Sequence, residues 1–182
     1  MTNFINFITV ARIFLAPIIL FFLIFGNYLI CLLLFFLAGL TDYFDGYLAR
    51  KYNAESQLGE ILDPIADKIL IVFILIGLSV DLDSFLIAFL GSLIIAREIG
   101  VSALRDYSSR NNKSHKTKVT YLAKIKTSVQ LFSIGLYLFA LAFSFNLLII
   151  IGDIFLIIAT LITLYTGYEY TLNVFKKWTL LL

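Results

Sequence analysis

Residues 38–70 read AGLTDYFDGYLARKYNAESQLGEILDPIADKIL and place two pairs of aspartates on either side of a polar stretch. Asp42 and Asp45 are three residues apart, and Asp63 and Asp67 are four apart. Side chains at these spacings lie on the same face of a helix. The segment therefore predicts two antiparallel helices joined by a polar connection, with all four carboxylates near one end of the helix pair.

The sequence around this segment is strongly apolar. Of 182 residues, 61% are hydrophobic and only 14% are charged, and the mean hydropathy is +0.98. Soluble domains carry about a quarter charged residues, and roughly 20 apolar residues cross a bilayer as a helix. The chain is therefore expected to be an all-α integral membrane protein with a single domain over residues 1–182 and six transmembrane helices. These are predicted at Phe7–Phe25, Tyr28–Ala49, Ile61–Val80, Phe85–Leu104, Leu122–Phe145 and Leu147–Tyr170.

The basic residues predict the orientation of these helices. None of the 14 lysines and arginines lies in the short turns after the first, third and fifth predicted spans, and the second of these turns contains Asp81 and Asp83. Lysine and arginine are enriched in cytoplasmic loops of membrane proteins. Both termini and the polar connections 50–60 and 105–121 are therefore expected in the cytoplasm, together with the aspartates.

The four aspartates predict a metal site. Carboxylates at membrane depth are costly unless they are neutralised, and oxygen ligands select Mg²⁺, Mn²⁺ or Ca²⁺. Two divalent cations would balance four carboxylates and could clamp a phosphoanhydride. The chain has one cysteine, Cys31, and one histidine, His115, which excludes a site built from several of these residues. A cation transporter is the remote alternative, although it would carry charges on several helices near the bilayer midplane.

The spacing of these residues resembles the signature of the CDP-alcohol phosphatidyltransferase family. The pattern Asp42-x₂-Asp45-Gly46-x₂-Ala49-Arg50-x₈-Gly59-x₃-Asp63-x₃-Asp67 matches all eight fixed residues of that signature. The resemblance implies a bacterial inner-membrane enzyme, usually a homodimer, that uses CDP-diacylglycerol in a lipid environment, with no nucleic acid partner. It also implies a pair of Mg²⁺ or Mn²⁺ ions held by the four aspartates, with Asp67 as the general base. The residues implied to contact CDP are Asp42, Asp45, Gly46, Ala49, Arg50 and Gly59.

Three further segments bear on the acceptor alcohol. The segments 6–18 (NFITVARIFLAPI), 97–107 (REIGVSALRDY) and 123–130 (AKIKTSVQ) resemble the phosphatidylglycerophosphate synthase branch, which uses sn-glycerol 3-phosphate. A dianionic acceptor that enters an acidic site requires cations of its own. We expect this basic acceptor site to consist of Arg97, Arg105, Lys124 and Lys126.

Alternatives to this acceptor site remain at this stage. The acceptor could be phosphatidylglycerol, as in a cardiolipin synthase, or serine or an inositol phosphate. Arg97 could form a structural ion pair with Glu98, and Lys124 and Lys126 could extend to the membrane interface. Lys68 could pair with Asp63 or Asp67 rather than bind substrate.

Overall fold

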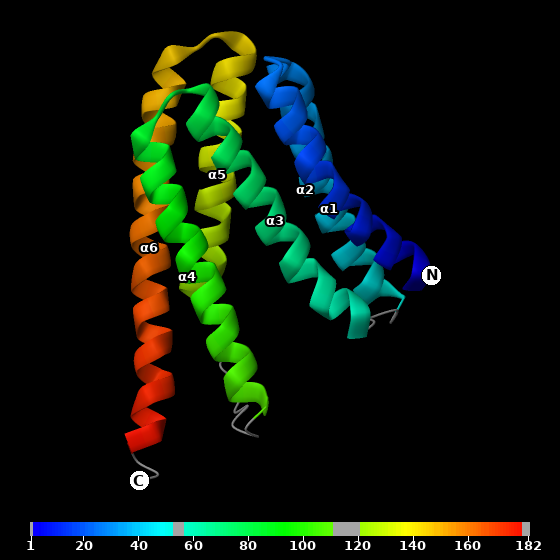
Figure 1. Ribbon diagram of the computed structural model, residues 1–182. Helices are drawn as coiled ribbons and strands as arrows, with labels where there is room; N and C mark the ends of the chain where they lie inside the picture. The colour runs from blue at the N-terminus through cyan, green and yellow to red at the C-terminus, as the bar shows by residue number, and fades with distance from the viewer. Residues whose placement is uncertain (1, 53–56, 111–120, 180–182) are drawn as a thin grey trace.

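The protein forms six α-helices within the part of the chain that the computed structural model describes, residues 2–52, 57–110 and 121–179 (Figure 1). The described residues contain no strand, so the predicted all-α class is confirmed. The helices are α1 (Thr2–Ile24), α2 (Tyr28–Lys51), α3 (Gln57–Asp81), α4 (Phe85–Arg110), α5 (Tyr121–Phe143) and α6 (Asn146–Thr179).

Five of the six helices are long and apolar enough to cross a membrane: α1, α2, α4, α5 and α6. α3 has 25 residues, or about 37 Å at 1.5 Å per residue, which is also sufficient to span a bilayer. Its first half carries Asp63, Asp67 and Lys68, which interrupt the apolar run. α3 nevertheless packs within the bundle, against α1 on one side and α4 and α5 on the other (Figure 1).

Three tight turns lie together at one end of the molecule, and both termini lie toward the opposite end (Figure 1). Each turn contains a residue in the left-handed region of φ: Gly26 at 70°, Asp83 at 46° and Ser144 at 57°. This conformation reverses the chain within a few residues and is readily adopted by glycine. The first and second, third and fourth, and fifth and sixth helices are therefore closely connected antiparallel pairs.

The six helices form two groups that diverge toward the end where the termini lie (Figure 1). α1 packs against α2 and α3, while α6 packs against α4 and α5. α2 contacts α5, and α3 contacts α4, which joins the two groups. The apolar core includes Ile19, Leu23, Cys31, Leu75 and Ile134.

The outer surface of the bundle is apolar. Phe14, Phe21, Leu33 and Phe36 are each more than half exposed, and they belong to α1 and α2. Side chains of this kind on the outside of a long helix are typical of contact with lipid rather than water. Among the polar side chains described below, Arg12, Asp45 and Lys126 are buried inside the bundle.

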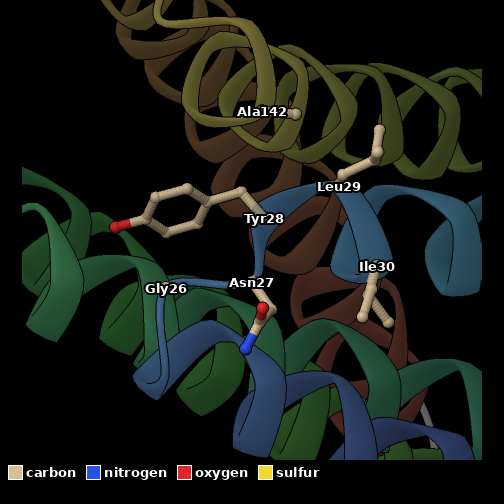
Figure 2. Close-up of a pocket in the computed structure, with 6 residues that line it drawn as sticks. All are labelled: Gly26, Asn27, Tyr28, Leu29, Ile30 and Ala142. Atoms are coloured by element: carbon tan, nitrogen blue, oxygen red, sulfur yellow. The ribbon is translucent and has the colours of Figure 1, made fainter.

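A shallow hollow is present beside the turn between α1 and α2 (Figure 2). Its lining has no charged side chain and consists of Gly26, Asn27, Tyr28, Leu29, Ile30 and Ala142. It lies at the end of the bundle that holds the short turns, whereas the aspartates lie toward the other end of α2 and α3. We therefore assign no chemistry to it.

Candidate active site

Arg12 of α1 lies among the aspartates of α2 and α3. Its Nη1 donates to Asp42 Oδ1 at 2.6 Å and to Asp67 Oδ1 at 3.1 Å. Its Nη2 donates to Asp45 Oδ2. The Arg12 side chain is only 1% exposed, so these ion pairs are shielded from water at the arginine. One guanidinium thus connects three carboxylates from two different helices.

Thr9, one turn before Arg12, brings the fourth aspartate into the same group. Its hydroxyl donates to Asp63 Oδ1 at 3.0 Å and lies 3.5 Å from Asp45 Oδ2. The spacing of three residues between Thr9 and Arg12 places both side chains on one face of α1. The structure therefore gathers all four predicted aspartates around two polar side chains of the first helix.

The carboxylates in this group differ in exposure. The Asp45 side chain is 4% exposed, whereas those of Asp42 and Asp67 are 51% and 43% exposed. A buried carboxylate requires a partner, and Arg12 supplies it for Asp45. Asp42 and Asp67 present oxygen atoms to the outside of the group, where a ligand can approach them.

The chemistry of the donors fits a hard divalent cation. All four are carboxylates, and one guanidinium against four carboxylates leaves a net charge of three negative when all are ionised. Within residues 2–52, 57–110 and 121–179, no three histidine, cysteine, aspartate or glutamate residues lie close enough to ligate one metal ion. The carboxylates are instead spread around Arg12. The donor set is therefore of the right type, and three of its four carboxylates pair with Arg12.

The structure describes only part of the implied CDP site. Gly46 is half-buried directly after Asp45, and Gly59 is buried near the start of α3. The side chains of Ala49 and Arg50 lie outside the described part of the structure, so their predicted contacts with CDP stay predictions.

Arg97 of α4 and Lys126 of α5 lie together in a second, basic group. Both donate to the same atom, Glu98 Oε1, Arg97 through Nη1 at 3.0 Å and Lys126 through Nζ. Their side chains are 11% and 9% exposed. The alternative of an ion pair between Arg97 and Glu98 is thus present in the structure. It does not remove the basic character of the group, because one carboxylate faces two cations.

The other two predicted acceptor residues are Arg105 and Lys124, and no contact among the described side chains joins Arg105 to this group. Arg105 is exposed on α4, about two turns beyond Arg97. The side chain of Lys124 lies outside the described part of the structure. Of the four predicted residues, the structure therefore joins Arg97 and Lys126 through Glu98.

Lys68 does not form the ion pair with Asp63 or Asp67 that its sequence position allowed. Its Nζ donates to Ser102 Oγ of α4, and Ser102 Oγ donates to the backbone oxygen of Glu98 at 2.7 Å. The reason is geometric: neighbouring residues on a helix point about 100° apart, so Lys68 leaves the face that carries Asp67. Lys68 consequently lies between two groups of charged residues. The acidic group consists of Asp42, Asp45, Asp63 and Asp67, and the basic group consists of Arg97 and Lys126 with Glu98.

Sequence reasoning missed the roles of Arg12 and Thr9 as partners of the aspartates. A signal was available, since an arginine inside an apolar span is costly and usually has a partner within the protein. Thr166 and Gly167 of α6, which contact Arg97, were missed as well. Neither has a sequence pattern that distinguishes it from an ordinary residue of a transmembrane helix.

Comparison with known proteins identifies the family of the chain. A family profile described as CDP-alcohol phosphatidyltransferase matches residues 2–168, which include both groups. The chain belongs to the CDP-alcohol phosphatidyltransferase family. The resemblance of the aspartate signature to this family is therefore confirmed, and so is the prediction of a membrane-embedded transferase.

Members of this family from several bacteria are similar to the chain over most of its length. Proteins of Rickettsia typhi and Rickettsia bellii are 40% and 41% identical to it, over 93% and 92% of this chain and 96% and 93% of theirs. A protein of Haemophilus influenzae is 35% identical, over 90% of this chain and 89% of its own. All three are named CDP-diacylglycerol–glycerol-3-phosphate 3-phosphatidyltransferase.

Proposed function

We propose that this protein transfers the phosphatidyl group of CDP-diacylglycerol to sn-glycerol 3-phosphate and releases CMP. The names of the relatives specify these two substrates for those proteins. The observation that carries the proposal for this chain is the pairing of an acidic group on α2 and α3 with a separate basic group on α4 and α5. Two phosphorylated substrates require two such regions.

The acidic group serves the CDP-lipid. Asp42, Asp45, Asp63 and Asp67 would hold two Mg²⁺ or Mn²⁺ ions, which would neutralise the diphosphate and stabilise charge as the anhydride breaks. Gly46, Ala49, Arg50 and Gly59 belong to the same part of the chain and would contact the CDP moiety. Arg12 is the ion-pair partner of the buried Asp45, because its guanidinium donates to Asp45 Oδ2 with both side chains almost fully buried.

Asp67 is the residue that would accept the proton of the acceptor hydroxyl. Its side chain is 43% exposed, so an acceptor hydroxyl can approach its carboxylate, and Arg12 contacts its Oδ1 and orients it. As the proton leaves, the hydroxyl oxygen bonds to the phosphorus that carries diacylglycerol, and the bond from that phosphorus to CMP breaks. The products are CMP and phosphatidylglycerophosphate.

The basic group serves the phosphate of the acceptor. Arg97 and Lys126 share one carboxylate oxygen of Glu98, so both retain N–H groups for a second anion. Arg105, which is exposed on α4, and Lys124 are the further cations that we propose for this phosphate. Serine and the hydroxyl of phosphatidylglycerol do not present a phosphomonoester, so they do not require two desolvated cations.

The enzyme would act at the cytoplasmic face of a bacterial inner membrane, with both termini on that side and a second copy of the chain as its partner. The distribution of all 14 basic residues supports the orientation. The family resemblance supports the homodimer.

The decisive experiment is an assay of the purified protein with CDP-diacylglycerol and a panel of acceptors, read by mass spectrometry of the lipid product. The panel contains sn-glycerol 3-phosphate, inositol 1-phosphate, serine and phosphatidylglycerol. We expect a phosphatidylglycerophosphate product with the first acceptor alone. A product with another acceptor and none with sn-glycerol 3-phosphate would contradict the proposal.

The metal requirement is tested in the same assay. A chelator should abolish CMP release, and addition of Mg²⁺ or Mn²⁺ in excess should restore it, because four carboxylates cannot approach a diphosphate without cations. Full turnover in the chelator-treated protein would show that the aspartates do not act through metal ions.

A further inference from the structure

The last helix, α6, contacts Arg97 through two consecutive residues, Thr166 and Gly167. Both are buried, and neither belongs to the signature of α2 and α3 or to the basic residues proposed for the acceptor. α6 runs beside α4, so the two residues face the arginine at the same level of the bundle.

Thr166 fixes the end of the Arg97 side chain. Arg97 Nη2 donates to Thr166 Oγ1 at 2.9 Å. The same hydroxyl lies 2.9 Å from the carbonyl oxygen of Ile162 and 3.0 Å from that of Thr163, so its own hydrogen is donated within α6. The backbone of α6 therefore orients the hydroxyl so that its lone pair faces the arginine.

Gly167 fixes the stem of the same side chain. A Cβ atom at this position would lie 2.8 Å from Arg97 Cγ, 2.8 Å from Nε and 3.4 Å from Cδ. The arginine therefore lies directly across the surface of the glycine, and no other residue leaves this room. Arg97 Nε is buried there with no hydrogen-bond partner in the structure, so the stem is held by packing.

The two contacts leave part of the guanidinium available. Glu98 accepts one N–H from Nη1, and Thr166 accepts one N–H from Nη2. Each of these nitrogens carries a second hydrogen, and the remaining two can donate to an oxyanion. Lys126 Nζ donates to the same carboxylate oxygen as Arg97 Nη1, so its ammonium group lies close to this guanidinium.

We propose that Thr166 and Gly167 are positioning residues for the acceptor: they hold the guanidinium of Arg97 in the orientation that receives a phosphomonoester. This inference rests on the proposed function, in which Arg97 binds the phosphate of sn-glycerol 3-phosphate. It makes α6 a determinant of acceptor affinity, although α6 contributes no charged group to the site.

The role of the Thr166 hydroxyl is tested by a matched pair of substitutions. Thr166→Val keeps the shape but removes the acceptor of the Arg97 hydrogen bond, and Thr166→Ser keeps the hydroxyl. We expect Thr166→Val to raise the KM for sn-glycerol 3-phosphate about tenfold, with the KM for CDP-diacylglycerol unchanged. Thr166→Ser should stay within about twofold of the wild type. Thr160→Val is the control, because the Thr160 hydroxyl bonds to the carbonyl of Leu156 in its own helix.

The role of Gly167 is tested by Gly167→Ala. The added methyl group must displace the Arg97 stem, so the KM for sn-glycerol 3-phosphate should rise about tenfold or more, up to the value of Arg97→Ala. The control is Gly100→Ala on α4, where a Cβ would meet no atom within 4 Å. Thermal unfolding of each purified variant separates a loss of folding from a change in the site.

The outcomes of these assays distinguish the inference from the proposed function. If wild-type protein turns over sn-glycerol 3-phosphate and Thr166→Val leaves its KM unchanged, the inference is wrong and the proposed function stands. An equal rise of both KM values in Thr166→Val would also overturn it, because a structural defect would act on both substrates. If the wild type does not use sn-glycerol 3-phosphate at all, the proposed function fails, and the inference fails with it.

Discussion

At the scale of single residues, Arg12 is the side chain on which the acidic group depends. It is 1% exposed and contacts Asp42, Asp45 and Asp67. A buried carboxylate that loses its partner is left as an uncompensated charge, which costs far more than the net contribution of an intact pair. A substitution of Arg12 is therefore expected to change both the stability of the protein and the position of the carboxylates in its site.

We predict that Arg12→Ala lowers the stability of the protein by about 3–5 kcal/mol, because Asp45 loses its buried partner. Arg12→Lys should recover only part of this, since an ammonium group cannot contact three carboxylates with a planar fork. Thermal unfolding in detergent provides the measurement. Arg105→Ala, at an exposed position of α4, is the control and should unfold near the wild-type temperature. Equal stability of Arg12→Ala and Arg105→Ala would contradict the assignment.

Asp67 gives a second prediction at this scale. Asp67→Asn keeps the size of the side chain but cannot accept the proton, so turnover should fall about 100-fold or more. The matched control is Asp81→Asn at the other end of the same helix, where the carboxylate accepts a hydrogen bond from Tyr28 at 3.1 Å. CMP release at saturating substrates is the readout. Loss of activity in both variants to the same extent would show that the effect is not local to the site.

At the scale of helices, α5 and α6 are joined tightly near their short turn, away from the aspartates. Tyr137 donates to Asp153 Oδ1 at 2.6 Å, and Ser133 donates to the carbonyl oxygen of Gly152 at 2.9 Å. A Cβ at Gly152 would lie 3.0 Å from Cε1 of the Tyr137 ring. Small residues that allow close approach are typical of helix contacts in membranes.

Gly152→Ala is therefore expected to destabilise the protein by about 1–3 kcal/mol, because a rigid aromatic ring must move. The KM values for both substrates should not change, since Lys126 of α5 and Thr166 of α6 lie further along these helices, away from Gly152. Thermal unfolding together with steady-state kinetics measures both effects. Gly100→Ala, which meets no neighbour, should be neutral or slightly stabilising. A stability of Gly152→Ala equal to that of Gly100→Ala would mean that this contact relaxes freely.

At the scale of the whole molecule, the two helix groups diverge toward the end where the termini lie (Figure 1). The acidic group belongs to α2 and α3, with its partner Arg12 on α1. The basic group belongs to α4 and α5, and α6 contacts it through Thr166. Lys68 connects them, because it extends from α3 to Ser102 of α4. Each substrate would therefore be held mainly by one helix group.

The orientation of the molecule in the membrane can be measured directly. In a Cys31→Ala background, Lys51→Cys should react with an impermeant thiol reagent only from the cytoplasmic side, and Asp83→Cys only from the outside. The reason is the bias of lysine and arginine toward the cytoplasm. Cys31 is buried, so its removal should not alter the exposed positions. Labelling of the two cysteines from the opposite sides would invert the topology and place the site outside.

The local sequence alone determined the helices, their apolar surfaces and the facing pairs of aspartates. These features depend on the length of an apolar run and on the helical repeat, and both can be read within one segment. The family signature in residues 42–67 likewise lies on one pair of adjacent helices.

Only the tertiary structure decided which distant residues share a site. Arg12 lies 30 residues from Asp42 and 55 from Asp67, and Arg97 lies 69 from Thr166. Helical periodicity gives the face on which a side chain lies but not the helix that this face meets. The pairing of α1 with α3 and of α4 with α6 follows from close packing of the whole bundle, which no single segment specifies. For this reason the aspartates were evident in the sequence, whereas the arginine that joins them and the glycine beneath Arg97 became evident only in the folded protein.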